Sequence, residues 1–197
     1  IGEESFPMEM ADENGFFAVL LEDRLELVPY HFLVTYEDGD SEEIVDPYSY
    51  QFYTAFTEEE VKKFGAGIYY DSYQKFGAHP TVEAGISGVH FAVWAPDAMR
   101  VSVVGDFNFW DGRRHQMKKR GPSGIYEIFI PGLKPGTIYK YEIKTKAGDP
   151  MLKADPYANF SELRPNTASV IWDMTDYQWN DGEWLEKRKA AKDRLKD

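Results

Sequence analysis

Two neighbouring aromatic residues, Phe109 and Trp110, follow a short polar turn at residues 105–108. An indole ring is costly to leave in water, so an aromatic pair beside such a turn is either packed or kept for a flat apolar ligand. A sugar ring has one face of C–H groups and a rim of hydroxyls, which makes it a ligand of this kind. The pair therefore suggests carbohydrate binding by stacking on Trp110. The alternative is a tryptophan packed at the edge of a sheet.

Three carboxylates could add catalysis to such a site, namely Asp106, Asp111 and Glu142. Hydrolysis of a glycosidic bond needs two carboxyl groups at a defined separation around a cleft. The sequence gives no sign that these three converge, and in a chain with 34 acidic residues some carboxylates lie close together by chance. We therefore predict no catalytic residue.

Other reactive residue types show no catalytic or metal-binding spacing. The chain has no cysteine, which excludes a thiol nucleophile, a disulfide framework and cysteine-bound zinc. The four histidines lack the spacing of a metal-binding helix and are expected in turns or strands: His31, His79, His90 and His115. A glycine-rich phosphate loop and a serine nucleophile elbow are also missing from the sequence. We predict no metal and no cofactor.

The charge pattern excludes two classes of partner. The net charge is −12, and residues 1–60 hold 17 acidic residues and one basic residue. Such an acidic half repels nucleic acid and anionic lipid, so we predict no nucleic acid and no membrane as partners. The sequence also has no apolar run that could span a bilayer and no amino-terminal signal segment, which favours a cytoplasmic protein. One basic cluster is expected as a solvated face: Arg113, Arg114, Lys118, Lys119 and Arg120.

The elements that position these residues form a repeat with an offset of 109 residues. Matches at alternating positions indicate the inward faces of strands, and matched glycines and prolines indicate shared turns. The matched residues are Met8 with Met117, Phe17 with Tyr126, Val19 with Ile128, Leu21 with Ile130, Tyr30 with Tyr139, Phe32 with Tyr141, Val34 with Ile143, Gly39 with Gly148, and Asp46-Pro47-Tyr48 with Asp155-Pro156-Tyr157.

Each copy is expected to be an immunoglobulin-like β-sandwich, because its strands are short and regularly spaced. We expect a hairpin between residues 125–130 and 138–145, and a matching hairpin between residues 16–21 and 30–36. The opening strands of the second copy, residues 89–94 and 100–104, have no counterpart in the first. We therefore expect an incomplete first sandwich in a chain that begins partway into a domain.

The remaining segments are expected to be helical. Thr57 followed by Glu60 forms a capping box that predicts a helix ending near Gly65 or Gly67. The tail from residue 183 onward has helical composition. The predicted fold is thus all-β, with two tandem sandwiches joined by a helical linker and followed by a helical tail. The expected boundaries are 1–50 for the partial sandwich, 51–77 for the linker, 78–175 for the complete sandwich and 176–197 for the tail.

Several motifs together resemble the bacterial 1,4-α-glucan (glycogen) branching enzymes, over essentially the whole chain. The motifs are Gly77-Ala78-His79-Pro80, Phe91 to Pro96, Gly105 to Asn108, Trp110 to His115, Lys153 to Tyr157, Arg164-Pro165, Ser169 to Asp173, and Trp184 with Lys187-Arg188. The strand with Trp-Ala-Pro alone also occurs in related debranching and trehalose-forming enzymes. The resemblance implies that residues 78–175 are a carbohydrate-binding module of family 48. It also implies that an α-amylase-type barrel, outside this chain, carries the catalytic residues.

The resemblance also suggests binding residues for an α-1,4-glucan, either glycogen or a maltooligosaccharide. It implies that Trp110 stacks on glucose and that Lys140, outward on its strand, donates to sugar hydroxyls; Asn166 adds a polar contact. Phe109, where relatives have a small residue or Asn, either widens the aromatic platform or buries itself against the sheet. Relatives also have a second aromatic residue near residues 148–151, which this sequence lacks.

Three readings of the chain's function follow. The first is a non-catalytic, inactive amino-terminal region that positions the glucan and supports the barrel of a branching enzyme. The second is a purely structural module, with Trp110 packed against the barrel and Lys140 a solvated strand lysine. The third is the matching module of a debranching or trehalose-forming enzyme. The offset places His31 at the Lys140 position and Ile1 at the Trp110 position, so the first copy is expected to be scaffold.

Overall fold

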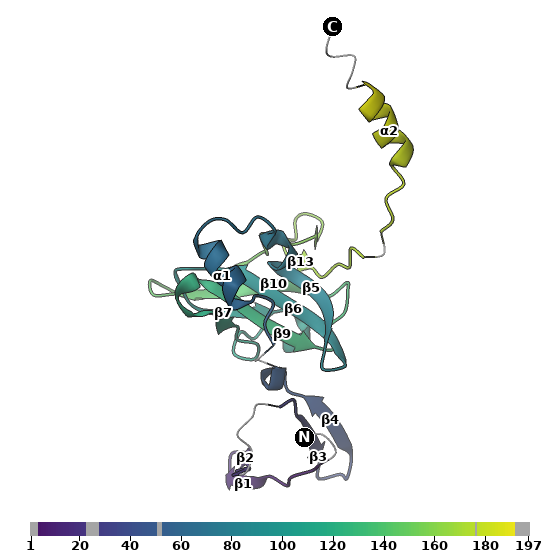
Figure 1. Ribbon diagram of the computed structural model, residues 1–197. Helices are drawn as coiled ribbons and strands as arrows, with labels where there is room; N and C mark the ends of the chain where they lie inside the picture. Colours follow the sequence, from purple (N-terminus) through teal and green to yellow (C-terminus); the bar gives the residue numbers. More distant parts are fainter. Residues whose placement is uncertain (1–3, 23–27, 51–52, 176, 192–197) are drawn as a thin grey trace.

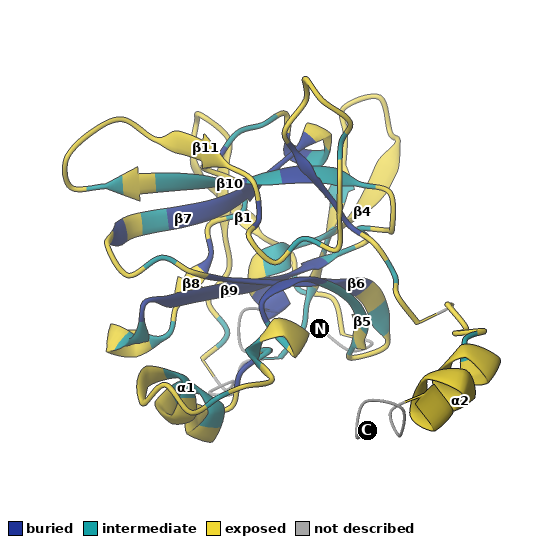
Figure 2. Ribbon diagram, turned by 90° about the horizontal axis from the view of Figure 1, so that it is seen from above, coloured by how far each residue is buried: buried dark blue, intermediate teal, exposed yellow. Residues whose placement is uncertain are grey.

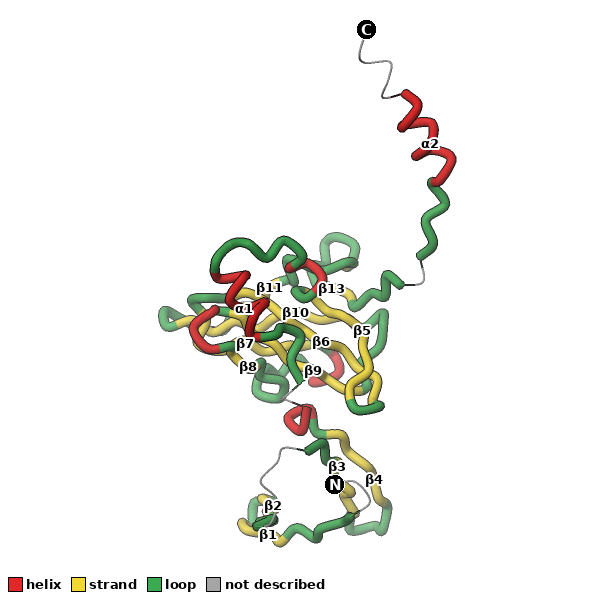
Figure 3. Tube along the Cα trace, viewed as in Figure 1, coloured by secondary structure: helices red, strands yellow, loops and turns green. Residues whose placement is uncertain are grey.

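The computed structural model describes residues 4–22, 28–50, 53–175 and 177–191. The described part is mainly β-structure, with helix at α1, α2 and a few short 3-10 turns (Figures 1 and 3). This predominance of strands over helices agrees with the predicted all-β class. Predictions that fall on Ile1 and on the end of the tail, residues 192–197, lie outside the described residues.

The second copy is a sandwich of two antiparallel sheets. One sheet has the order β5-β6-β9-β8, with bounds Gly77–Glu83, Ile86–Trp94, Ile125–Pro131 and Lys118–Lys119. In the other, the central strand β10 pairs with β7, β11 and β13, and β13 pairs with β12. Their bounds are β7 Ala98–Val104, β10 Ile138–Thr145, β11 Met151–Lys153, β12 Phe160–Ser161 and β13 Ser169–Val170. Figure 2 shows the two layers, with buried residues where they face each other.

The core of this sandwich forms between the two layers. Alternate residues of each strand point inward, as the period-two pattern predicts. The buried core residues are Ala78, Val89, Phe91, Val93, Ala98, Val101, Val103, Met117, Tyr126, Ile128, Ile130, Tyr139, Tyr141 and Ile171. The same alternation leaves Lys140 and Glu142 on the outer face of β10.

The predicted hairpin between residues 125–130 and 138–145 is wrong. β9 pairs with β6 and β8, whereas β10 pairs with β7, β11 and β13 in the other sheet. The connection after β9 therefore crosses from one sheet to the other, and the Gly136 N–H donates to the Ile171 carbonyl instead of to β9. A hairpin and a sheet-crossing connection have the same alternating pattern, so the sequence could not separate them.

The two copies share a hydrogen-bonding frame at the predicted offset. Tyr30 Oη donates to Asp46 Oδ2 at 2.7 Å, and Tyr139 Oη donates to Asp155 Oδ2 at 2.6 Å. Oδ1 of each aspartate accepts from the backbone N–H two residues later, at 2.9 Å in the first copy and 2.8 Å in the second. The pairing register is also shared, since Phe32 pairs with Ile44 as Tyr141 pairs with Lys153. The repeat is thus confirmed at the level of individual bonds.

The first copy forms two separate two-stranded ladders. β1 (Glu9–Asp12) pairs with β2 (Phe16–Ala18), and β3 (His31–Thr35) pairs with β4 (Ser41–Val45). Among the described residues no ladder joins β2 to β3, so the predicted pairing of 16–21 with 30–36 is also wrong. Two-stranded ladders cannot bury both of their faces. Apolar side chains accordingly stay exposed: Met10, Phe16, Phe17, Val19, Leu20, Leu33 and Ile44.

The segment between the copies packs against the second sandwich. A 3-10 turn, η1 (Pro47–Tyr50), buries Tyr50 beside Phe129, with ring centroids 5.4 Å apart. Helix α1 (Glu58–Gly65) begins at Thr57, whose side chain accepts from the Glu60 N–H while Glu60 accepts from the Thr57 N–H. The predicted capping box is confirmed.

An ion-pair network centred on buried Arg120 and Glu127 fixes this segment to the sheet. Arg120 donates to both Glu58 and Glu127, and its side chain is 9% exposed. Glu127 also accepts from the N–H groups of Ala55, at 2.9 Å, and Phe56. Arg120 therefore does not belong to a solvated basic face. Its role was not visible in sequence because its partners are 62 and 7 residues away.

Helix α2 (Gly182–Ala191) has no buried residue and extends away from the sandwich (Figure 1). Its Arg188 guanidinium lies over the Trp184 ring, 5.2 Å from the centroid, as the helical spacing of the two residues predicts. Within the described part of the chain, no helix is long and apolar enough to cross a membrane.

Candidate functional site

The turn that carries Trp110 has an unusual backbone. The 3-10 turn η3 (Asp106–Asn108) is followed by Phe109 and Trp110, both in the left-handed region at φ 58° and 59°. That region costs an ordinary residue about 1 kcal/mol or more, so the surroundings must impose it. Buried Asn108 does so, because its side chain accepts from the Gly105 N–H and donates to the Val103 carbonyl.

The turn displays its two aromatic rings differently. Phe109 is 80% exposed, with the Arg114 guanidinium 5.3 Å from its ring centroid. It is therefore not buried against the sheet. Trp110 is half-buried, and its indole N–H donates to Asp106 Oδ1 at 2.7 Å. This bond fixes the orientation of the indole plane, which a stacking platform requires.

Lys140 lies beside this turn on the outer face of the sheet. It is the register partner of Val104 on β7, the residue directly before Gly105. A Cβ atom at Gly105 would overlap the Ile138 carbonyl oxygen and the Phe107 ring, so only glycine lets the turn approach β10. The Trp110 N–H donates to the Gly105 carbonyl at 2.9 Å. The turn that holds Trp110 therefore starts next to Lys140.

The loop at residues 162–168 adds polar groups to the same region. Lys140 Nζ donates to Thr167 Oγ1 at 2.8 Å. Asn166 Nδ2 donates to Glu162 Oε1 at 3.2 Å, and Glu162 Oε2 accepts from the Ala168 N–H. Asn166 therefore helps to hold the loop that carries Thr167. Leu163 in this loop is 90% exposed.

Sequence reasoning missed the contribution of Thr167, Glu162 and Leu163. Thr167 precedes β13, and only the pairing of β13 with β10, with Ser169 opposite Tyr139, brings it to Lys140. Two-residue strands such as β12 and β13 leave too short a pattern to detect in sequence. A leucine in the polar stretch between Glu162 and Asn166 was the signal that the sequence offered.

The three carboxylates do not converge. Asp106 accepts from Trp110, and Glu142 pairs with Arg100 while Gly112 packs against it. Hydrogen bonds from the Arg113 side chain and backbone hold the pKa of Asp111 well below its usual value. Each carboxylate therefore has its own structural partner, and the arrangement supports no acid–base pair.

The histidines also have structural partners. His115 is an example: Asn108 Nδ2 donates to its Nδ1 at 2.9 Å, and burial, with the Arg114 charge, lowers its pKa to about 4. The other contacts are His31 with Glu43, His79 with the Phe76 carbonyl and His90 with Glu83. Across the described residues, no cluster of three or more His, Asp or Glu could hold a metal.

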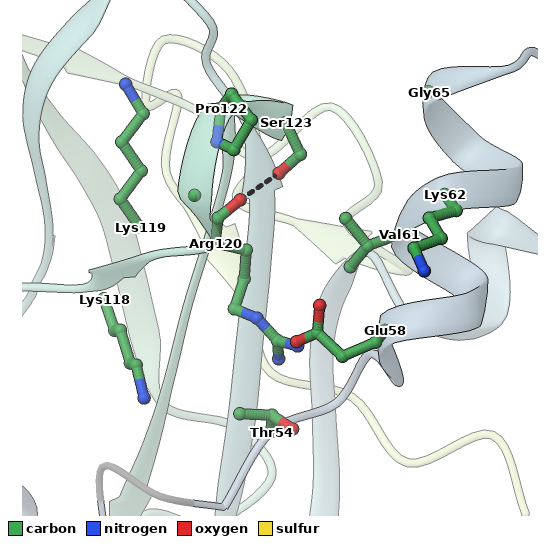
Figure 4. A pocket seen from close by; sticks show the side chains of 11 residues that line it. Thr54, Glu58, Val61, Lys62, Gly65, Lys118, Lys119, Arg120, Pro122 and Ser123 are labelled. Carbon is green, nitrogen blue, oxygen red and sulfur yellow. Dashed lines mark hydrogen bonds and ion pairs between the residues drawn. The ribbon is translucent and has the colours of Figure 1, made fainter.

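An open groove of about 760 Å³ lies on the opposite side of the sandwich, between α1 and the turn at residues 121–123 (Figure 4). Its most prominent charged pair is Arg120 with Glu58 (Figure 4). This ion pair neutralises part of the charge that lines the groove. The turn of Trp110 follows β7, which belongs to the other sheet. The groove is therefore separate from the candidate site.

Two family models match separate parts of the chain. Residues 75–158 match the family described as Carbohydrate-binding module 48 (Isoamylase N-terminal domain), and residues 1–48 match the alpha-1,4-glucan branching enzyme GlgB, N-terminal domain. The 1,4-alpha-glucan branching enzyme GlgB of Rubrobacter xylanophilus is 46% identical over 182 residues, which is 92% of this chain and 24% of that protein. GlgB of Synechococcus sp. (strain JA-3-3Ab) is 56% identical over 128 residues, covering 65% of this chain and 17% of that protein.

Among solved structures, pullulanase type I from Bacillus subtilis complexed with maltose aligns at a TM-score of 0.43. The identity is 25%, over 64% of this chain and 16% of that chain. The chain spans about a quarter of the length of the curated relatives that it matches most fully.

The sandwich and the family match define a carbohydrate-binding module of family 48. Residues 1–48 match the amino-terminal domain of GlgB, and the relatives that align over most of the chain are also GlgB proteins. The chain belongs to the amino-terminal region of the 1,4-α-glucan branching enzyme family.

Proposed function

We propose that the outer face of the second sheet, around Lys140 and the turn of Trp110, binds an α-1,4-glucan chain, such as glycogen or a maltooligosaccharide. One observation carries the proposal: a strained turn that starts beside Lys140 holds the Trp110 indole in a fixed orientation. Strain at an exposed turn is a hallmark of functional sites, because folding alone gains nothing from it. Trp110 would stack on the apolar face of a glucosyl ring, and Lys140 and Asn166 would bond its hydroxyls. Phe109 would extend the platform.

In the whole protein, this module would position the glucan for branching. We propose that the parent enzyme forms α-1,6 branches in α-1,4-glucan, and that its catalytic barrel lies outside these residues and packs against them. The binding module would span residues 78–175, since β13 and the 162–168 loop complete the face. The lack of cysteine supports a reducing compartment and hence a cytoplasmic location.

Titration of the chain with maltoheptaose tests the proposal. Calorimetry on the wild type, Trp110→Ala and Lys140→Ala should show binding by the wild type and weaker binding by both variants. The matched control is Trp179→Ala, because Trp179 is 76% exposed and lies in the segment before α2. Equal binding by the wild type and Trp110→Ala would remove Trp110 from the site.

A structural role is the second candidate, and one observation favours it. Trp110 and Lys140 already have partners within the chain, Asp106 and Thr167. If these bonds served only to close the turn and the loop, the chain would bind no maltoheptaose at millimolar concentration. Trp110→Ala would then lower the free energy of unfolding without changing a binding isotherm.

A further inference from the structure

A stacked aromatic pair lies on the second sheet, away from the turn of Trp110. Phe160 on β12 and Trp172 just after β13 have ring centroids 4.9 Å apart and planes at 27°. The two residues are 50% and 44% exposed. Apolar rings that stack on each other and still face solvent form a flat surface of the kind that a sugar ring can cover.

The alternation of β13 places this pair on the same face as Lys140. Ser169 Oγ accepts from the buried Asp155 N–H, and Ile171 belongs to the core, so both residues point inward. Val170 and Trp172 therefore point outward, and Phe160 is the register partner of Val170.

The same register connects the pair to Lys140. Val170 is also the partner of Ile138 on β10, two residues before Lys140. Residues two apart on a strand share a face. Lys140, Phe160 and Trp172 are thus all on the outer face of one sheet, and this continuity extends the proposed glucan-binding surface.

The geometry fits a chain-shaped ligand. Neighbouring strands lie about 4.8 Å apart, so β12, two strands from β10, is about 10 Å from Lys140. Trp110 approaches Lys140 from the opposite side, through β7. On the β7 side the loop closes over the sheet, because Ser102 Oγ donates to the Gly112 carbonyl and Gly112 packs on Glu142. Lys140 therefore lies between the turn of Trp110 and the aromatic pair on the outer face of this sheet.

We infer that Phe160 and Trp172 form a second stacking subsite for the same α-1,4-glucan chain. This inference rests on the proposed function. The sequence lacks the second aromatic residue that relatives have near residues 148–151. The Phe160–Trp172 pair would supply a second stacking platform from a different part of the fold. A single glucose unit cannot reach both platforms, so the pair would add affinity only for longer chains.

The test compares maltoheptaose with maltotriose by calorimetry on the 197-residue chain. In the double variant Phe160→Ala/Trp172→Ala, the Kd for maltoheptaose should rise roughly two- to tenfold, the range expected for loss of one aromatic contact. The ratio of maltotriose Kd to maltoheptaose Kd should fall by the same factor. Trp179→Ala, which removes an aromatic residue outside the sheet, should match the wild type in both.

Trp172→Leu guards against misfolding, because it keeps apolar packing and removes only the stacking face. It should raise the maltoheptaose Kd in the same direction. The inference is overturned if Trp110→Ala weakens binding while both pair variants bind like the wild type; the proposed function then stands alone. If the wild type binds neither sugar, the proposed function fails and the second subsite fails with it.

Discussion

Replacement of Glu127 by alanine should release the linker from the sandwich. The Glu127 side chain is 1% exposed and accepts from Arg120 and from the N–H groups of Ala55 and Phe56. Glu127→Ala leaves a buried guanidinium without its main partner, which typically costs about 3–5 kcal/mol. Two backbone N–H groups also lose an acceptor, at about 1 kcal/mol or more each if they stay dry.

Relaxation of α1 toward water would recover part of this loss. We therefore expect the free energy of unfolding to fall by about 3–5 kcal/mol, close to the lower end of the combined terms. For a chain of this size the fall corresponds to a decrease in Tm of roughly 10 °C. Urea titration followed by far-UV circular dichroism measures the first quantity, and a thermal scan measures the second.

A matched glutamate provides the control. Glu59 is on the same helix segment and pairs with Lys63 at 2.6 Å, but its side chain is 75% exposed. Glu59→Ala should change stability little, because solvent screens exposed pairs. If Glu127→Ala is no more destabilising than Glu59→Ala, the network does not hold the linker. Arg120→Met/Glu127→Met should be less destabilising than Glu127→Ala, because it leaves no buried charge.

Three further predictions concern the turn and the repeat. Stability should fall as pH decreases from about 6.5 to about 4, because burial lowers the pKa of His115 and the unfolded chain binds the proton first; urea titrations should show a smaller fall for His115→Gln. Gly105→Ala should reduce both stability and maltoheptaose affinity because its Cβ would overlap Ile138, whereas Gly148→Ala, with open space around it, should change neither measurement. Tyr139→Phe should lower the free energy of unfolding by about 1–3 kcal/mol, and Tyr30→Phe by less, because only Tyr139 is fully buried; paired urea titrations compare them.

The repeat and the inward faces could be predicted from sequence because both are local patterns. The period of two placed Tyr139 and Tyr141 inward and Lys140 outward, which the structure confirms. The partner of each strand could not be predicted this way. Alternation says which face of a strand is buried and nothing about which strand lies beside it, so both predicted hairpins were wrong.

In the candidate site too, some residues could be recognised from the sequence and others could not. Trp110 and Lys140 stood out by residue type, and the structure places the Trp110 turn beside Lys140. Their supporting residues did not stand out: Asn108 is one polar residue in a polar turn, and Thr167 reaches Lys140 only through the β10–β13 register. Phe160 and Trp172 are 12 positions apart, and no local period links them. Long-range register, not residue type, assembles this face.

The hydrogen-bonding frame that the two copies share contains different residues from the proposed glucan-binding surface. The tyrosine–aspartate bond and the register of β3 with β4 recur in β10 with β11, yet His31 occupies the position of Lys140 and bonds Glu43 and the Tyr50 hydroxyl, whereas Lys140 bonds Thr167. None of the residues in the proposed glucan path belongs to the shared frame. The proposed path lies on the outer face of the second sheet. The strained turn and the exposed rings on that face lie outside the sandwich core, which is why we propose a binding role for them.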